Sequence, residues 1–203
     1  MIGYLRSVGK PYLTAGGRRV VVFDFLGFGA SDKTAGAKYS FEQQLCDLYV
    51  VVQELNLDKI IPVGHGSSGP AAVNYTIEHP EHIDCVCLMN AFYVDSPTAK
   101  YPELIELFAT TNLKALTQAI LRSPEQYACA LNFQWSKLQE YLKEDQKEFY
   151  ARFLGPLIDA NFRNQPGSGP AFAKMTSQLF EELAKNTKRI NKMWANDIPV
   201  KLI

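Results

Sequence analysis

The stretch VGHGSSGPAA, from Val63 to Ala72, has the residue types of a sharp strand-to-helix turn that presents a reactive side chain. Such a turn needs small residues two places before and two places after the reactive position, because larger side chains would clash there. Gly64 and Ser68 are these small residues, so the reactive position falls on Gly66. Glycine has no side chain that could attack a substrate. The sequence therefore predicts a nucleophile turn without its nucleophile.

Neighbouring side chains could replace the missing group. Ser67 and Ser68 carry hydroxyls, and His65 is a candidate base. A serine hydroxyl is a weak nucleophile unless a base lies within hydrogen-bond reach, and successive residues of a tight turn point in different directions. We favour the interpretation that the small residues let helix and sheet pack closely. A displaced serine nucleophile, and anion binding by the helix N-terminus, remain as alternatives.

Alternating strand and helix patterns surround this turn. The apolar run RRVVVFDF, Arg18–Phe25, predicts a strand buried on both faces. A helical period follows from Ser40, which forms a capping-box pattern with Gln43. Strands, helices and short connections in alternation predict a parallel sheet with right-handed crossovers. The further predicted elements are a strand over residues 58–66, a helix over Gly69–Glu78 and a strand over residues 83–90.

From Ala91 to Asp197 helical patterns dominate, and the last residues, IPVKLI, begin another strand pattern. Helices inserted between two sheet strands would form a lid over the carboxyl edge of the sheet, where ligands of open α/β sheets bind. We predict helices over residues 101–110, 113–122, 125–144, 145–164 and 172–196. The predicted domains are residues 1–95 as the first part of a core, 96–190 as a helical cap and 191–203 as the start of the returning core.

Three stretches together resemble a known family: PYLTAGGRRVVVFDFLGFGASDK, VGHGSSGPAAVNYTIEHPEHI and CLMNAFY. They are similar to the α/β-hydrolase superfamily, in its haloalkane dehalogenase and epoxide hydrolase branch. The resemblance covers roughly Tyr4 to Pro97 and the final WANDIPVKLI. It implies an α/β fold, with an incomplete parallel-sheet hydrolase core and an inserted all-helical cap. In that branch the turn commonly contains Gly-His-Asp, two further residues and a glycine.

The resemblance assigns roles that this chain does not fill. Gly66 falls on the nucleophilic aspartate, Ser67 on a halide-binding tryptophan, and Asn90 on a catalytic acid of some members. The oxyanion motif falls before Tyr4 and the catalytic histidine beyond Ile203. Loss of a nucleophile or base typically lowers turnover on the order of a millionfold. The resemblance thus implies the fold and weakens the expectation of activity.

Aromatic residues of the helical segment are candidates for substrate binding, together with Asn90. They are Trp135, Tyr127, Tyr141 and Tyr150. Cap tyrosines of epoxide hydrolases activate the epoxide oxygen, so the resemblance makes the three tyrosines candidate counterparts. Aromatic residues at helical spacing also form the core of a helical domain. The sequence leaves both interpretations open.

Composition restricts the ligands and the compartment. The 21 basic and 21 acidic residues give zero formal net charge, which provides no electrostatic footprint for nucleic acid or an anionic membrane. The four cysteines lack CxxC spacing, and His79 and His82 are predicted to be solvated at a helix end. We therefore expect no metal and no cofactor. Without an apolar run of membrane-spanning length, we expect a soluble, cytoplasmic protein.

These observations lead to one main hypothesis: a hydrolase-like protein for a small, mostly apolar ester, epoxide or alkyl halide, with weak or absent turnover. Alternatives are an active serine enzyme, a non-catalytic protein that binds a small molecule or a protein, and a piece of a longer hydrolase. An exposed sheet edge, at Val20–Asp24 or at the final IPVKLI run, also predicts a homodimer.

Overall fold

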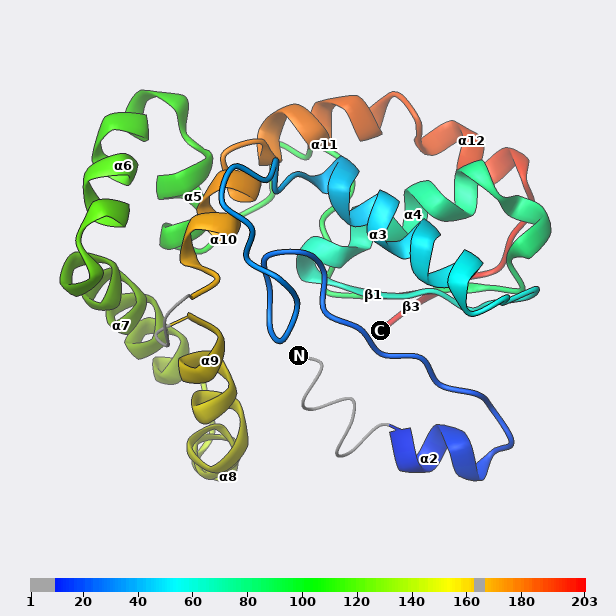
Figure 1. The fold of residues 1–203 in the computed structure, drawn as a ribbon, viewed down its shortest axis with the longest axis horizontal. Coiled ribbons are helices and arrows are strands. Elements are labelled where there is room, and N and C mark those ends of the chain that lie inside the picture. The colour runs from blue at the N-terminus through cyan, green and yellow to red at the C-terminus, as the bar shows by residue number, and fades with distance from the viewer. Residues whose placement is uncertain (1–9, 163–166) are drawn as a thin grey trace. The chain divides into compact units, whose positions relative to one another are not determined.

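The computed structural model describes residues 10–162 and 167–203. The chain divides into two compact units, which are described separately below (Figure 1). The sheet unit comprises Lys38–Tyr101 and Lys174–Ile203, and the helical unit comprises Met1–Ala37 and Pro102–Ala173.

The sheet unit contains three parallel strands in the order β1-β2-β3. They are β1 (Val63–His65), β2 (Val86–Met89) and β3 (Val200–Leu202). Val63 pairs with Cys87, and Val86 pairs with Val200. Helix α4 (Gly69–Glu78) connects β1 to β2 and packs beside α3 (Phe41–Glu54), as Figure 1 shows. The predicted α/β class and parallel sheet are confirmed, and α4 has the predicted bounds.

Helix α4 is the centre of the sheet unit because every residue from Gly69 to Ile77 is buried. Its apolar side chains pack against those of β2 and of α12 (Ile190–Ala195), which follows α11 (Leu179–Thr187). This cluster contains Ala72, Val73, Ile77, Val86, Tyr93 and Met193. The resulting core holds α4 against β2 and α12.

The start of α3 agrees with half of the predicted capping box. The Ser40 hydroxyl accepts a hydrogen bond of 3.0 Å from the Gln43 backbone N–H. The Gln43 side chain donates instead to Asp47 Oδ1 at 2.8 Å. A capping box also requires the Gln43 side chain to bind the Ser40 backbone N–H. This half of the prediction is wrong, because the Gln43 amide binds the carboxylate one helical turn further on.

The helical unit has its own apolar core, formed by Leu104, Phe108, Tyr127, Leu131 and Ala173. The predicted helices over 101–110, 113–122 and 125–144 are present as shorter elements, and those over 145–164 and 172–196 are interrupted. Residues 163–164 of the predicted helix lie outside the described residues. The described helices of this unit are α2 (Lys10–Ala15), α5 (Glu103–Ala109), η4 (Thr111–Leu113), α6 (Lys114–Arg122), α7 (Pro124–Glu140), α8 (Glu144–Phe149), the π-helical turn η5 (Tyr150–Leu154), α9 (Gly155–Phe162) and α10 (Gly169–Thr176), whose last three residues belong to the sheet unit.

One predicted strand is wrong. Arg18–Phe25 is not a strand, and its residues are exposed or half-buried rather than buried on both faces. A strand needs a neighbour for its backbone N–H and C=O groups, and the three strands of the described residues pair only with one another. The domain boundaries and the role of the helices as a cap stay predictions. No helix within residues 10–162 and 167–203 is long and apolar enough to cross a membrane.

Candidate functional site

The predicted turn is present at the carboxyl end of β1. His65 ends the strand, and the short helical turn η2 (Gly66–Ser68) leads directly into α4. Gly66 has φ +56°, in the left-handed region that strains residues with a side chain. A Cβ atom built on Gly66 would meet no atom within 4 Å. A side chain at this position would therefore stand free, as a nucleophile does.

Close packing explains the small residues around Gly66. A Cβ atom on Gly64 would lie 3.0 Å from Gly69 Cα and 3.1 Å from Ala72 Cβ. A Cβ atom on Gly69 would lie only 2.5 Å from Ala91 Cβ. The prediction that small residues let helix and sheet approach is thus consistent with the geometry. The role of Gly69 was missed, although its place three residues after Gly66 was a usable signal.

The two serines of the turn differ in their surroundings. The Ser68 hydroxyl accepts from the His65 N–H at 2.8 Å and donates to the His65 carbonyl oxygen at 2.9 Å. Its proton is therefore committed to the backbone. Ser67 is exposed, and its hydroxyl forms no hydrogen bond with any residue of the described part of the chain. Burial lowers the pKa of the His65 imidazole, which favours the neutral form that a base requires.

Asn90 lies beside the turn. It directly follows β2, and the pairing of His65 with Met89 puts Gly66 and Asn90 next to each other at the same sheet edge. Asn90 is exposed and has φ +44°, a conformation that asparagine adopts more readily than most residues. The structure thus brings these two predicted positions together, and neither offers an acid or a nucleophile.

Tyr127 and Trp135 belong to the core of the helical unit. Tyr127 is only 8% exposed, and a Cβ atom on Gly169 would lie 2.7 Å from its ring. The Tyr127 hydroxyl and the Trp135 indole N–H have no hydrogen-bond partner among the residues described. Burial raises the pKa of Tyr127, so the phenol keeps its proton. Their packing fits the core interpretation, whereas the unpaired donors fit a ligand contact.

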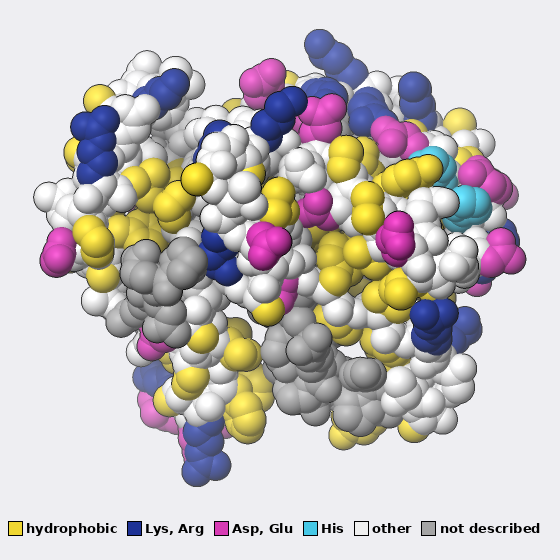
Figure 2. All heavy atoms as spheres, in the orientation of Figure 1, with side chains coloured by type: hydrophobic (Ala, Val, Ile, Leu, Met, Phe, Trp, Pro, Cys, Tyr) yellow, Lys and Arg dark blue, Asp and Glu magenta, His cyan; other side chains and the backbone are white. Residues whose placement is uncertain are grey.

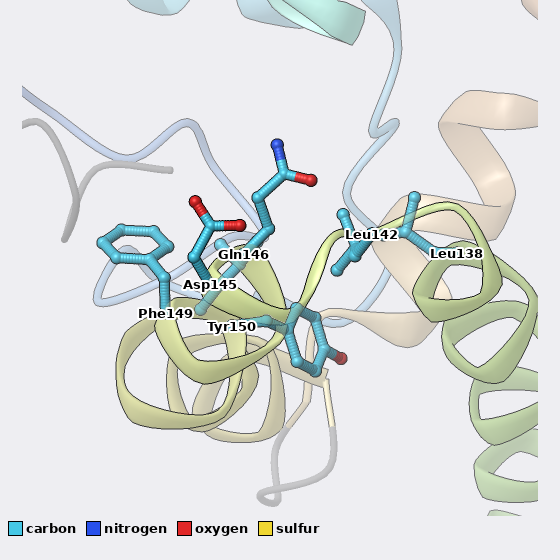
Figure 3. A pocket seen from close by; sticks show the side chains of 7 residues that line it. Leu138, Leu142, Asp145, Gln146, Phe149 and Tyr150 are labelled. Atoms are coloured by element: carbon cyan, nitrogen blue, oxygen red, sulfur yellow. The ribbon is translucent and has the colours of Figure 1, made fainter.

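Tyr150 lines an open cavity of about 410 Å³ in the helical unit. It is the first residue of η5, and π-helical turns are frequent at functional sites. Figure 3 shows its ring below Leu142, with Asp145 and Gln146 extending from α8, which precedes η5. Tyr141, by contrast, is 82% exposed and does not line this cavity. The full lining is Leu138, Leu142, Asp145, Gln146, Phe149, Tyr150 and Leu154.

Comparison with known proteins identifies the family. The model of the alpha/beta hydrolase fold family matches residues 4–200, so the chain belongs to that family. The chain is 25% identical over 186 residues to the 2-hydroxy-6-oxononadienedioate/2-hydroxy-6-oxononatrienedioate hydrolase of Escherichia coli K12. This match covers 87% of the chain and 62% of the relative. The chain thus spans less than two thirds of that relative's length.

Solved structures show the same fold. An esterase from Exiguobacterium antarcticum matches with a TM-score of 0.61 and 16% identity, over 99% of this chain and 78% of the esterase. A haloalkane dehalogenase from Bradyrhizobium elkani matches with a TM-score of 0.56 and 16% identity, over 88% and 60%. The resemblance inferred from the three sequence stretches is confirmed for the family and the fold.

Proposed function

We propose that this chain is a hydrolase-fold protein for a small, mostly apolar organic molecule of the ester, epoxide or alkyl halide class, and that its own turnover is weak or absent. The observation that carries this proposal is Gly66, with φ +56° and open space around it, in a turn that is otherwise formed as a nucleophile requires. The names of its relatives, a hydrolase, an esterase and a dehalogenase, support the substrate class.

The surroundings of the turn support weak turnover. Glycine cannot attack, and the Ser68 hydroxyl already binds both backbone groups of His65. Removal of a nucleophile typically lowers turnover on the order of a millionfold, while binding contacts survive. Substrate recognition without covalent chemistry is therefore the function that we assign to this site.

We assign substrate cover to the helical segment, with Tyr127, Trp135 and Tyr150 as its candidate contacts. Two of them carry buried donors without a partner in the described residues, and the third lines a cavity with apolar walls. Ligand pockets are typically apolar with few polar groups, which agrees with this composition. The four free cysteines support a reducing compartment, and we propose the cytoplasm.

Restoring the nucleophile tests the proposal. In Gly66→Asp, a carboxylate oxygen should displace halide from a small 1-haloalkane and leave an ester on residue 66, which intact mass and peptide mapping detect. Aspartate tolerates positive φ better than most residues, and no atom obstructs its Cβ. The wild type and Gly36→Asp, at another open position with φ +82°, should form no ester. A folded Gly66→Asp protein that forms no ester would contradict a vacated nucleophile position.

A displaced nucleophile is the second candidate function. It rests on the exposed Ser67, whose hydroxyl is free among the described residues and which follows the half-buried His65 by two positions. In this case a fluorophosphonate would label Ser67 in the wild type, and Ser67→Ala would abolish labelling. The main proposal predicts no label in either protein.

A further inference from the structure

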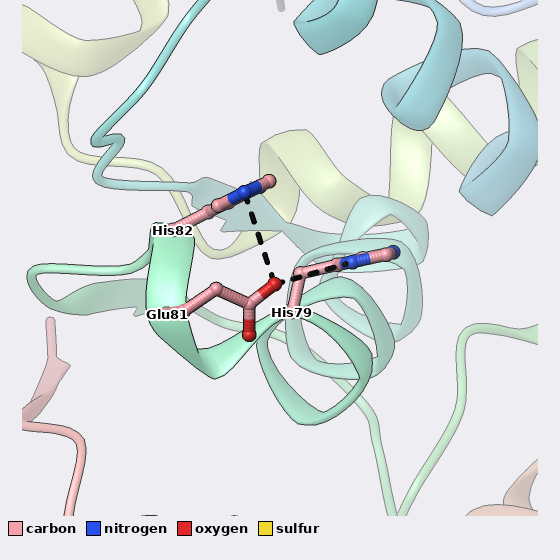
Figure 4. A group of neighbouring side chains, drawn as sticks. All are labelled: His79, Glu81 and His82. Carbon is pink, nitrogen blue, oxygen red and sulfur yellow. Dashed lines mark ion pairs between the residues drawn. The ribbon is translucent and has the colours of Figure 1, made fainter.

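Three potential metal ligands converge at the carboxyl end of α4. Glu81 Oε1 lies 3.8 Å from His79 Nδ1 and 3.8 Å from His82 Nε2 (Figure 4). The ligand atoms of the three side chains all lie within 4.8 Å of one another. The two imidazole rings are stacked, with 14° between their planes. The sequence predicted only solvated histidines here, because spacing alone does not give the direction of their rings.

We propose that His79 Nδ1, His82 Nε2 and the Glu81 carboxylate bind a divalent transition metal of the Zn²⁺ type. Zn²⁺ accepts imidazole nitrogen and carboxylate oxygen at about 2.0–2.2 Å, usually in a tetrahedron, which spaces the ligand atoms about 3.4 Å apart. The two observed separations of 3.8 Å exceed this spacing by about 0.4 Å, and the stacked imidazole rings must turn about their Cβ–Cγ bonds so that both nitrogen lone pairs point at one ion. Three protein ligands leave the fourth position to water.

Backbone hydrogen bonds hold this segment in place. Pro80 begins the short turn η3 (Pro80–His82), and the His82 N–H donates to the His79 carbonyl oxygen at 3.0 Å. The His82 carbonyl oxygen accepts from the Ile60 N–H at 2.9 Å, which ties the turn to the strand region before β1. Binding therefore requires little ordering of the chain. The ion would also lie at the carboxyl end of a 10-residue helix, where the helix dipole favours positive charge.

Tyrosine side chains position both imidazoles. The hydroxyl of Tyr75, which is fully buried, lies 3.4 Å from His82 Nδ1. When Nδ1–H donates to this oxygen, the lone pair of Nε2 is directed to the metal, which is the usual role of an outer hydrogen bond to a ligating histidine. The His79 ring packs against the rings of Tyr75 and Tyr49, with centroids 4.7 Å and 5.6 Å away.

The site is open to solvent and separate from the nucleophile turn. The side chains of His79 and His82 are 28% and 30% exposed and that of Glu81 is 62% exposed. Figure 2 shows histidine side chains at the surface among acidic groups. The 10 residues of α4, about 15 Å of helix, separate these ligands from Gly66 at its other end. We infer a structural role for the ion, which would cross-link the side chains of the segment that connects α4 to β2.

Titration of the metal-free chain with Zn²⁺ in a calorimeter tests the site. We expect one equivalent to bind, with an affinity that falls at least about tenfold in each of His79→Gln, His82→Gln and Glu81→Gln. Tyr75→Phe should weaken binding by about tenfold through His82 alone. His65→Gln is the matched control, because it changes the third histidine of the chain outside the cluster. Its affinity should equal that of the wild type.

Cobalt distinguishes this site from a cysteine site, since Cys85 and Cys87 follow closely in the sequence. Bound Co²⁺ should give the visible spectrum of tetrahedral nitrogen and oxygen ligands without a thiolate charge-transfer band. A thermal melt of each variant confirms that it is folded. Three results would overturn the proposal: absence of binding in the wild type, wild-type affinity in the three ligand variants, or a thiolate band. None of these results depends on hydrolase activity.

Discussion

Gly69 offers a sharp test of the packing that forms the nucleophile turn. Its backbone is right-handed helical, with φ −55°, so alanine meets no conformational strain there. The obstacle to Gly69→Ala is steric alone, because the new Cβ would lie 2.5 Å from Ala91 Cβ. Carbon atoms in optimal contact are about 3.5–4.0 Å apart. The start of α4 would therefore have to move by about 1 Å away from the residues after β2.

This displacement sets the expected cost. Ala91 has no flexible side chain that could swing away, so the backbone must shift, and overpacking of this kind costs about 1–3 kcal/mol. The better helix propensity of alanine offsets less than about 1 kcal/mol of this. After this offset, we expect Gly69→Ala to lower the free energy of unfolding by about 1–2 kcal/mol in urea titrations followed by far-ultraviolet circular dichroism.

A second substitution isolates the contact. Ala91→Gly removes the obstructing Cβ and leaves Ala91 Cα at 3.6 Å, an ordinary contact distance. The double variant should recover about 1 kcal/mol or more, measured as a coupling energy in a double-mutant cycle. Gly36→Ala is the control for conformational strain, with φ +82° and no atom within 4 Å, and Ala91→Gly should not rescue it. If Gly69→Ala is as stable as the wild type, or Ala91→Gly fails to restore stability, the packing argument is wrong.

Other predictions concern the core, its titration and the sheet edges. The buried Tyr93 hydroxyl donates to Asn74 Oδ1 at 2.8 Å, so Tyr93→Phe should cost about 1–3 kcal/mol in the same urea assay. Burial raises the pKa of Tyr93 from 10.0 to about 12, so the folded state holds the phenol proton more tightly. The contribution of this protonated phenol to stability should be complete below pH 10 and lost as the pH rises towards 12. Tyr93→Phe should therefore remove part of the fall in the free energy of unfolding over this pH range. Leu131→Ala, at a 2% exposed core position, should cost about 2–5 kcal/mol, detected as a lower thermal midpoint of the helical unit. We propose self-association through the edge at β3, where Leu202 is 79% exposed; light scattering should show dimers that Leu202→Lys dissociates, and a wild-type monomer would contradict this.

The sequence predicted those elements whose signals are local. Helix α4 has the predicted bounds because Gly69 and Pro70 follow a tight turn and His79-Pro80 ends the helical pattern. Arg18–Phe25 has an equally apolar pattern and is not a strand. Strand formation requires a neighbouring chain segment, and an apolar pattern does not say whether one is present. The prediction therefore failed where the decisive interaction is not local.

The same distinction applies to the candidate site. The spacing of Gly64 and Ser68 was sufficient to assign Gly66 to the nucleophile position, since the steric requirement of the turn is local. It could not show that the Ser68 hydroxyl binds the His65 backbone, because that depends on the path of the turn. Nor could helical spacing distinguish the buried Tyr127 from the exposed Tyr141, which depends on how separate helices pack.

Fluorophosphonate labelling of the purified wild-type chain tests most directly whether the turn lacks a nucleophile. The reagent transfers its phosphonyl group to an activated serine oxygen with loss of fluoride, and intact mass with peptide mapping locates the adduct. A thermal melt of the same sample establishes that the protein is folded. We predict no adduct on Ser67 or Ser68 in a cooperatively melting sample. A single stoichiometric adduct on Ser67 would show that a displaced nucleophile and a base are present, and would contradict our account.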